Sequence, residues 1–368
     1  MFQQQTHQQT HQQTQLIKYL HETNQLDKYI CNMLENLDVV PDDLLKDYYM
    51  CCKALSKTPF IIGINDFTCT DTKDIDGLTH IMFSSNPCIF KDTDGTYKMN
   101  IRMINYFMDE VENRLYYSNK TISINKLLTL SFDNNDNSLM IVDDIHDFNI
   151  PSNLDKKNNG LEDLRVYETS NGLGFIGSAQ VSKDNEDHIG IIIGKYDTSK
   201  SFLESVNIYS PFDKIKEKNW VFFGNKIIYQ WFPLTIASIN NEGNLDILDT
   251  IPSNPFFRNI RGSSNGCFVK NKETGDEEIW FLCHGVNIEN IPRHYYHCFV
   301  ILENVIENEQ HKIRIKKWSL LFKFEGCRIE FSLGMIVEDT RILVSYSTWD
   351  KTSKIMILDR EGIETNLF

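Results

Sequence analysis

From about residue 59 to the C-terminus, short runs rich in Ile, Val, Phe, Tyr and Trp alternate between apolar and polar residues. A period of two is typical of β-strands, and turn pairs such as Asp94-Gly95 and Asn171-Gly172 separate the runs. The clearest runs are Leu127–Phe132, Ser138–Val142, Gly174–Ser178, Ile189–Gly194, Val221–Phe223, Lys226–Trp231, Ile279–Cys283, Cys298–Leu302, Ile342–Tyr346 and Lys354–Leu358. Such runs favour a β-propeller of four-stranded blades over a sandwich, which usually needs only about 100 residues. We predict an all-β, five-bladed β-propeller, interrupted by one helix around Met103–Leu115.

The first 57 residues follow other patterns. Residues 1–15 are low-complexity Gln/Thr/His sequence, which cannot bury apolar area and is expected to be disordered. Between residues 16 and 57 apolar residues recur every three or four positions, and Pro41-Asp42-Asp43 resembles a helix start. The sequence therefore predicts a Gln-rich tail (1–15), a small N-terminal helical cap (16–57) and a propeller domain (58–368).

Composition excludes several classes of protein. The chain has 51 acidic and 37 basic residues, a net charge of -14, which argues against a nucleic-acid binder but leaves room for one small anion pocket. Nine cysteines, with no Cys-x-x-Cys pair, indicate reduced thiols rather than zinc sites or disulfides. No basic-then-apolar leader occurs, and no apolar stretch reaches the ~18 residues of a membrane span. We expect a soluble cytoplasmic protein; its oligomeric state is left open.

Candidate functional residues are polar side chains inside apolar strand sequence, because propellers gather such groups at one mouth of the central channel. Glu162, Asp163 and Arg165 lie between apolar residues, where an acid either pairs with a base or has the shifted pKa that a general acid needs. Arg102 alternates with apolar neighbours and is either an exposed strand arginine or a ligand contact.

Cations and aromatic residues recur further along the chain. Lys218 precedes Trp220, and Arg261, His284 and Tyr296 lie in a segment rich in Arg, His and Tyr. Guanidinium and imidazole groups donate hydrogen bonds to sugars and phosphates, whereas carboxylates at metal-ligand spacing are absent nearby. No metal or cofactor is therefore expected.

Five motifs in order resemble the five-bladed β-propeller family of mannoside phosphorylases, glycoside hydrolase family 130, and the related β-mannosyltransferases of glycosyltransferase family 108. The motifs are Asn86-Pro87 with Arg102, Gly160-Leu161-Glu162-Asp163-Leu164-Arg165, Lys218-Asn219, Cys283-His284-Gly285-Val286, and Phe331-Ser332-Leu333-Gly334 with Asp350. The second is similar to the family's Gly-x-Glu-Asp-Pro-Arg, with Leu164 in place of proline. The segment with Gln230-Trp231 lacks an arginine expected to bind phosphate.

The resemblance implies a carbohydrate-active enzyme that transfers or phosphorolyses a hexosyl unit, a β-mannosyl unit in this family, with inversion. It makes Asp163 the proton donor and a carbohydrate the ligand, with inorganic phosphate or a sugar phosphate as co-substrate. Residues implied for sugar binding are Asn86, Arg102, Glu162, Tyr296 and Asp350, and those for phosphate binding are Arg165, Lys218, Arg261 and His284.

A non-catalytic glycan-binding or scaffolding propeller is the main alternative, since the fold alone does not decide function. A protein-interaction propeller, without convergent cations, is a third. The enzyme predicts that Asp163 lies within reach of a sugar beside Arg165, Lys218 and His284. The non-catalytic alternative predicts that Asp163 is buried in an ion pair between blades.

Overall fold

The computed structural model describes residues 52–368 except residues 76, 110–114, 118–120, 149–159, 184–185, 200, 213–215, 288–292 and 308–309. The predicted tail and nearly all of the predicted helical cap lie outside the described residues. The end of the predicted cap contains strand β1 (Lys53–Ala54) and a 3-10 helix, η1 (Leu55–Lys57).

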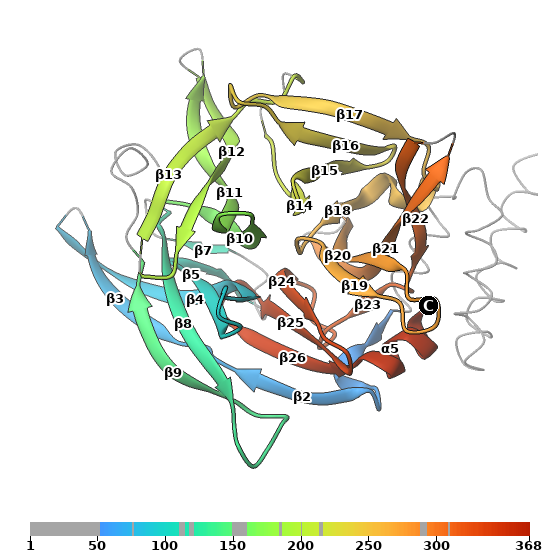
Figure 1. Cartoon of the computed structure of the whole chain (residues 1–368). Helices are drawn as coiled ribbons and strands as arrows, with labels where there is room; N and C mark the ends of the chain where they lie inside the picture. Colours follow the sequence, from blue (N-terminus) through green and yellow to red (C-terminus); the bar gives the residue numbers. More distant parts are fainter. Residues whose placement is uncertain are drawn as a thin grey trace, which may run out of the picture.

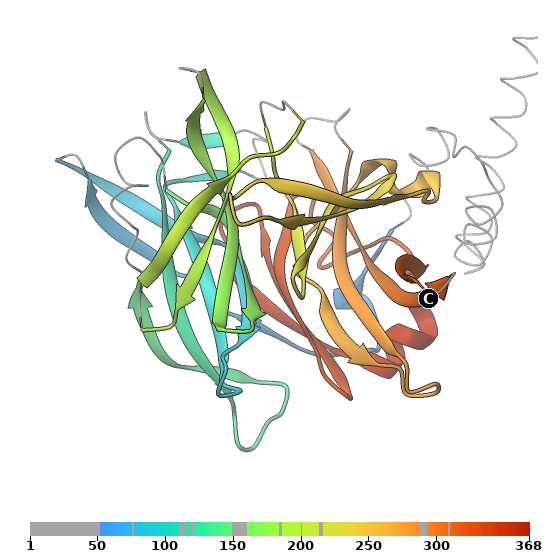
Figure 2. The ribbon, with the colours of Figure 1, turned by 45° about the horizontal axis from the view of Figure 1, so that its top comes forward.

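Five sheets of four or more strands stand side by side around a central axis (Figures 1 and 2). The first contains β3 (Thr70–Ile75), β4 (Leu78–Lys91), β5 (Tyr97–Ile104), β8 (Ser123–Phe132) and β9 (Met140–Asp147). The second contains β10 (Glu162–Thr169), β11 (Gly172–Lys183), β12 (Glu186–Asp197) and β13 (Ser201–Ile208). The third contains β14 (Val221–Phe223), β15 (Lys226–Trp231), β16 (Leu234–Ile239) and β17 (Leu245–Ile251).

The fourth sheet is larger and the last sheet joins the two ends of the ring. The fourth contains β18 (Ile260–Gly262), β19 (Cys267–Lys270), β20 (Glu277–Asn287), β21 (His294–Glu307), β22 (Gln310–Trp318), β23 (Phe322–Lys323) and β1. The last contains β2 (Ile61–Asp66), β24 (Glu330–Val337), β25 (Arg341–Thr348) and β26 (Lys354–Asp359). A second 3-10 helix, η2 (Pro255–Asn259), precedes β18, and helix α5 (Arg360–Leu367) follows β26.

The all-β class and the propeller-like arrangement are confirmed. The blade count of five stays a prediction, because the seven-stranded fourth sheet departs from a simple four-stranded blade. No helix in the described part of the chain is long and apolar enough to cross a membrane.

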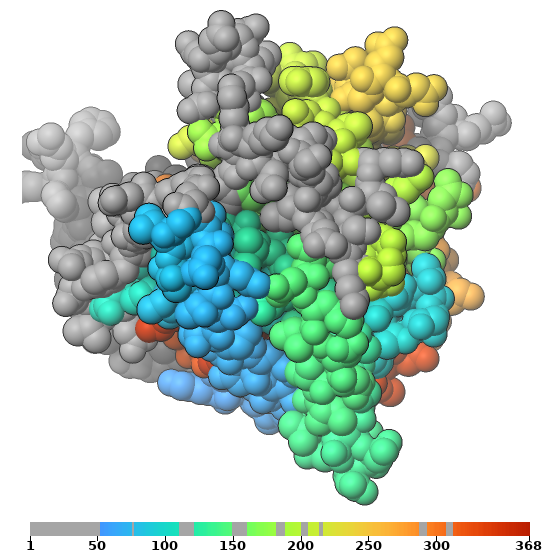
Figure 3. All heavy atoms as spheres, turned by 90° about the vertical axis from the view of Figure 1, so that its left-hand side faces the viewer, coloured from blue at the N-terminus to red at the C-terminus, as the bar shows by residue number. Residues whose placement is uncertain are grey.

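The ring is closed by pairing between strands from opposite ends of the domain. β2 runs antiparallel to β26, with Ile64 opposite Met356. The Asn65 amide then bridges to the first sheet, donating to the Ser138 carbonyl at 3.0 Å and accepting from the Met140 amide at 2.8 Å. Figure 3 shows the outer side of that first sheet, with β3 in blue and β9 in green. Closure therefore depends on backbone pairing and on one buried amide.

Apolar side chains fill the space between neighbouring sheets. One cluster combines Met99 and Ile101 of β5 with Leu343 of β25 and Ile357 of β26. Near the axis, the Ser345 hydroxyl accepts from the Ile89 amide at 3.0 Å and donates to the Pro87 carbonyl at 2.8 Å. The first and last sheets are thus joined both by apolar packing and by a buried hydroxyl.

The predicted helix around Met103–Leu115 is wrong wherever the structure describes that segment. β5 continues to Ile104, and β6 (Tyr106–Met108) pairs antiparallel with β7 (Leu115–Tyr117). The run from Met103 to Met108 is apolar apart from Asn105, and periodicity alone does not separate helix from strand in such a run.

Replacing Gly334 with alanine is expected to destabilise the fold, because β24 passes too close to β4 for a side chain. A Cβ atom there would lie 2.3 Å from the Ile89 nitrogen and 2.7 Å from its carbonyl oxygen. We expect Gly334→Ala to lower the free energy of unfolding by about 3 kcal/mol, measured by chemical denaturation. The control is Gly275→Ala, at a turn with φ of +76° and open space, where backbone strain alone costs about 1–2 kcal/mol. Equal losses in the two variants would contradict the steric argument.

Candidate functional site

The non-glycine residues with positive φ in the described part of the chain concentrate at the predicted motifs. They are Asn86 (40°), Asp163 (52°), Asn219 (65°), Trp349 (56°) and Asp350 (54°). Asn86 and Asp163 lie at irregular pairings of β4 and β10, Asn219 precedes β14, and Asp350 follows β25. Such backbone costs roughly 1–3 kcal/mol per residue and tends to occur at functional sites. The backbone strain alone therefore indicates that these residues form a candidate functional site.

Asp163 is held by residues of the neighbouring sheet. Its Oδ1 accepts from Asn86 Nδ2 at 3.0 Å and from Arg102 Nη1 at 3.2 Å. Asn86 is fixed in turn, because its Oδ1 accepts from the Ser347 hydroxyl at 2.8 Å. The Asp163 side chain is 14% exposed, and no described residue hydrogen-bonds its other oxygen. Asp163 is therefore part of an ion pair between sheets, and its other oxygen has no hydrogen-bond donor among the described residues.

Arg102 joins two acids in this cluster. Its side chain is only 4% exposed, and Nη2 lies 3.1 Å from Glu162 Oε1 and 2.9 Å from the Tyr106 hydroxyl. Nε donates to the Ser123 hydroxyl at 2.8 Å. The other Glu162 oxygen accepts from Lys218 Nζ at 3.1 Å. The interpretation of Arg102 as an exposed strand arginine is excluded.

Asp163 and Asp350 have pKa values shifted in opposite directions. Burial raises the pKa of Asp163, but Arg102, Lys218, Arg165 and the Asn86 hydrogen bond together lower it below its ordinary value. For Asp350, burial raises the pKa to about 6; Arg102 opposes this shift, and the nearby charges of Asp163 and Glu162 add to it. Asp163 is thus an ionised carboxylate, whereas Asp350 keeps a proton into the weakly acidic range.

Arg165, predicted to bind phosphate, is largely occupied by the protein. It is buried and donates to the carbonyls of Asp163, Gly262 and Ser263 and to Asn219 Oδ1. A guanidinium has five N–H groups, so these contacts leave one. Arg165 acts here as a clamp that links β10 to residues of the third and fourth sheets.

His284 and Arg261, the other predicted phosphate ligands of the fourth sheet, differ in environment. His284 is buried, its Nδ1 lies 2.8 Å from the Ser263 hydroxyl, and burial lowers its pKa well below the usual range. It is therefore neutral and offers hydrogen bonds without charge. Arg261 is exposed and, with Lys218, lines a side pocket of about 520 Å³ that shares Asn219 and Gly262 with the cluster.

Tyr296 does not join the cluster, so this predicted sugar contact is wrong. It is buried in the hydrophobic core with Phe256 and Phe257, and Lys323 Nζ lies 5.0 Å from its ring centre. Its neighbour Tyr295 points to the opposite face of β21, and its ring centre lies 6.0 Å from that of His284. Burial raises the pKa of Tyr295, with a smaller contribution from Asp350. Tyr295, the residue before Tyr296, therefore lies at the site, and the sequence did not indicate it.

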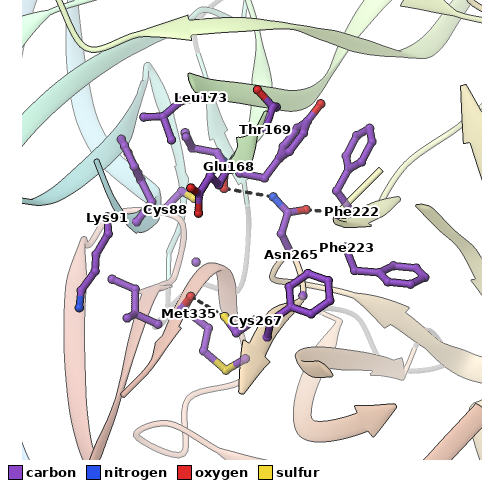
Figure 4. Close-up of a pocket in the computed structure, with 18 of the residues that line it drawn as sticks. Cys88, Lys91, Glu168, Thr169, Leu173, Phe222, Phe223, Asn265, Cys267 and Met335 are labelled. Carbon is purple, nitrogen blue, oxygen red and sulfur yellow. Dashed lines mark hydrogen bonds between the residues drawn. The ribbon is translucent and has the colours of Figure 1, made fainter. Parts of the chain in front are cut away.

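A larger cavity of about 1070 Å³ lies further along the inner strands and contains none of the predicted site residues (Figure 4). Its walls are mainly apolar, and its central amide is already paired. Asn265 donates to the Val166 carbonyl at 3.1 Å and accepts from the Phe222 amide at 2.9 Å. Size alone therefore does not identify the functional site.

The described residues contain no group of three or more His, Cys, Asp or Glu side chains suited to hold a metal ion. The cluster of Arg102, Glu162, Asp163, Lys218 and Asp350 can instead bind hydroxyl groups, exchange a proton and attract an anion.

No protein-family model matches the sequence, and no curated protein matches it. Solved structures with a similar overall shape do exist. A β-1,2-mannobiose phosphorylase from Listeria innocua has 13% identity and a TM-score of 0.49, over 86% of this chain and 96% of that one. A GDP-Man-dependent mannosyltransferase from Leishmania mexicana has 14% identity and a TM-score of 0.44, over 84% and 94% of the two chains. A mannose phosphorylase from the same organism has 11% identity and a TM-score of 0.43, over 84% and 92%.

These proteins are mannoside phosphorylases and a mannosyltransferase, the classes of enzyme that the sequence motifs resemble. At such identities and TM-scores, the similarity says nothing of the reaction of this chain, which has to be argued from its own residues.

Replacing Arg102 with methionine should destabilise the protein strongly, because two acids would lose their buried partner. We expect the free energy of unfolding at neutral pH to fall by about 3–5 kcal/mol. Asp163 has a lowered pKa, so its share of this stabilisation is present above the pKa of the unfolded chain and is lost as the pH falls through the folded pKa. Denaturant unfolding at neutral and acidic pH measures this effect.

The matched control is Lys218→Met, since Lys218 also pairs with Glu162 but is 32% exposed. We expect a loss of about 1 kcal/mol or less for that variant. An Arg102→Met loss as small as the control's would show that the buried ion pair does not support the fold.

Proposed function

We propose that this chain is a carbohydrate-active enzyme that transfers a hexosyl unit to or from phosphate or a sugar hydroxyl, with inversion. The observation that carries the proposal is the pair of carboxylates around Arg102, whose pKa values are shifted in opposite directions. In enzymes that transfer glycosyl units, one carboxyl of such a pair donates a proton, and the other stays ionised and stabilises positive charge on the sugar. The motif resemblance supports a β-mannosyl unit as the sugar and a propeller with five blades, one for each large sheet.

In the proposed reaction Asp350 donates its proton to the oxygen of the leaving group as the bond from the anomeric carbon to that oxygen breaks. A phosphate oxygen, or the oxygen of a sugar hydroxyl that passes its proton to water, forms the new bond from the opposite face of the sugar. Asp163 stays ionised and stabilises positive charge on the ring in the transition state. The sequence assigned the proton to Asp163; the proposal moves it to Asp350, because Arg102 and Asn86 hold Asp163 as a carboxylate.

Sugar hydroxyl groups would be bound by Asn86 and Glu162, and phosphate by Lys218 and Arg261. Arg165 and His284 would position these groups rather than supply charge, given their own burial and partners. The co-substrate is inorganic phosphate or a sugar phosphate, and no metal or other cofactor enters the reaction.

A non-catalytic glycan-binding propeller is the second candidate, and one observation favours it. The Arg102–Asp163 contact joins β5 of one sheet to β10 of the next, as a structural ion pair would. The Asp163 oxygen without a hydrogen-bond donor among the described residues and the raised pKa of Asp350 support the enzyme instead.

Turnover separates the two candidates. The full chain is incubated with mannose 1-phosphate or GDP-mannose plus acceptor sugars, and released phosphate or nucleotide is measured. We expect Asp350→Asn and Asp163→Asn each to lower kcat by about 10²–10⁴-fold. Asp339→Asn, at an exposed loop aspartate, is the matched control and should be fully active. Absence of turnover by the wild type across a broad donor panel would remove the catalytic claim.

The pH profile should report the protonation of Asp350. Its carboxyl keeps the proton below a pKa of about 6, so kcat/KM should fall roughly tenfold per pH unit above that value. Asp163, with a lowered pKa, stays ionised throughout this range. The residual activity of Asp350→Asn should lack the alkaline decline. A decline that persists unchanged in this variant would assign the proton to another group.

A further inference from the structure

The side pocket beside the cluster gathers cations in an acidic protein. Its basic lining residues are Lys216, Lys218, Arg258, Arg261 and Arg293, and they come from three separate stretches of the chain. The chain as a whole has a net charge of -14. Glu217 is the pocket's acidic lining residue, and it is buried, with its two oxygens accepting from Trp220 Nε1 at 3.3 Å and the Tyr229 hydroxyl at 3.0 Å.

Most of these cations lack an anionic partner in the described part of the chain. Lys218 pairs with Glu162, and Arg293 hydrogen-bonds the Tyr295 hydroxyl. Lys216, Arg258 and Arg261 are exposed and form no ion pair with any described carboxylate. Converging cations repel one another, so their positions favour a bound anion.

Trp231 also lines the pocket and is 2% exposed. Its indole Nε1 is buried and has no hydrogen-bond partner among the described residues, so it is not a contact for a molecule in the pocket. The ring packs against Phe257 and Phe281 and serves as a fluorescent reporter next to the pocket.

We propose that the side pocket binds an anion with two linked phosphate groups, a diphosphate. The pocket volume is about 520 Å³, whereas a single water needs only about 10–15 Å³ of such space, so the pocket holds more than one phosphate. One phosphate would also leave several of the cations unpaired, whereas a diphosphate spans the distance between separate groups of donors. Lys218, Asn219 and Gly262 border both the pocket and the cluster, so one end of the anion lies next to the proposed reaction centre.

Isothermal titration of the full chain tests the site with inorganic pyrophosphate, orthophosphate and GDP as probes. We expect pyrophosphate to bind at one site at least tenfold more tightly than orthophosphate, with affinity falling as salt is added. Arg258→Ala and Lys216→Ala should each weaken binding by about tenfold, the loss of one charge-assisted contact. Both side chains are exposed, so the variants should stay folded, which circular dichroism checks.

Lys272→Ala is the matched control, because it removes one exposed cation outside the pocket and changes the net charge equally. Its pyrophosphate affinity should equal that of the wild type. Tryptophan fluorescence should change on pyrophosphate binding, and Trp231→Phe should lose that change. The GDP arm identifies the source: tighter binding than pyrophosphate points to a nucleotide, and weaker binding to the free anion.

The proposal is overturned if pyrophosphate fails to bind at about 1 mM in low salt, or if Lys272→Ala weakens binding as much as Arg258→Ala. The assignment rests on the proposed function in that Lys218 and Arg261 also bind its phosphate, but the two can be tested separately, because Asp350→Asn should keep its pyrophosphate affinity. A wild type that binds pyrophosphate without any turnover would contradict the proposed function and leave the pocket assignment intact.

Discussion

The buried guanidinium of Arg102 is the constraint on which the site depends. A charge at 4% exposure is tolerable only if it is paired and hydrogen-bonded, and its partners come from two sheets. Ser123 belongs to the same sheet as Arg102, whereas Glu162 and Asp163 belong to the next. The irregular start of β10 and its positive φ at Asp163 accompany this pairing. The backbone strain at Asp163 and the buried charge of Arg102 therefore belong to the same contact between sheets.

Cations around the cluster fall into two groups that differ in what they have left to bind. Arg102 and Arg165 are buried and donate to protein acceptors on several sides. Lys216, Arg258 and Arg261 are exposed and have no carboxylate partner among the described residues. The first group supports the architecture, and the second is available to an anion. Cations of both groups lie close to the motifs, so position in the sequence does not separate the two groups. The number of N–H groups that remain free to bind a ligand does separate them.

Sequence patterns predicted the sheets and much of the cluster, for an identifiable reason. In a ring of sheets, corresponding ends of the inner strands meet at one mouth, so motifs in order along the chain converge in space. Asn86, Arg102, Glu162, Asp163 and Lys218 accordingly form one hydrogen-bonded network.

The errors arose where periodicity is ambiguous. Tyr106 lies in the segment predicted as a helix, yet its hydroxyl accepts from Arg102 at 2.9 Å. The sequence predicts Tyr296 as a sugar contact and does not point to Tyr295, and a shift of one residue along a strand exchanges the two faces. Irregular pairing, as in β4 and β10, moves side chains between faces in a way that no alternation pattern records.

An ion pair between sheets and a catalytic role for the cluster are compatible, because the two demands fall on different atoms. Arg102 and Asn86 both donate to one oxygen of Asp163, and the other has no hydrogen-bond donor among the described residues. Burial raises the pKa of Asp350 to about 6, the nearby charges of Asp163 and Glu162 add to this rise, and the same Arg102 charge opposes it. Neutralising Asp163 would therefore lower the pKa of Asp350 and narrow the acidic pH range in which Asp350 keeps its proton. The ionised carboxylate that stabilises the fold is thus also what keeps its neighbour a usable acid.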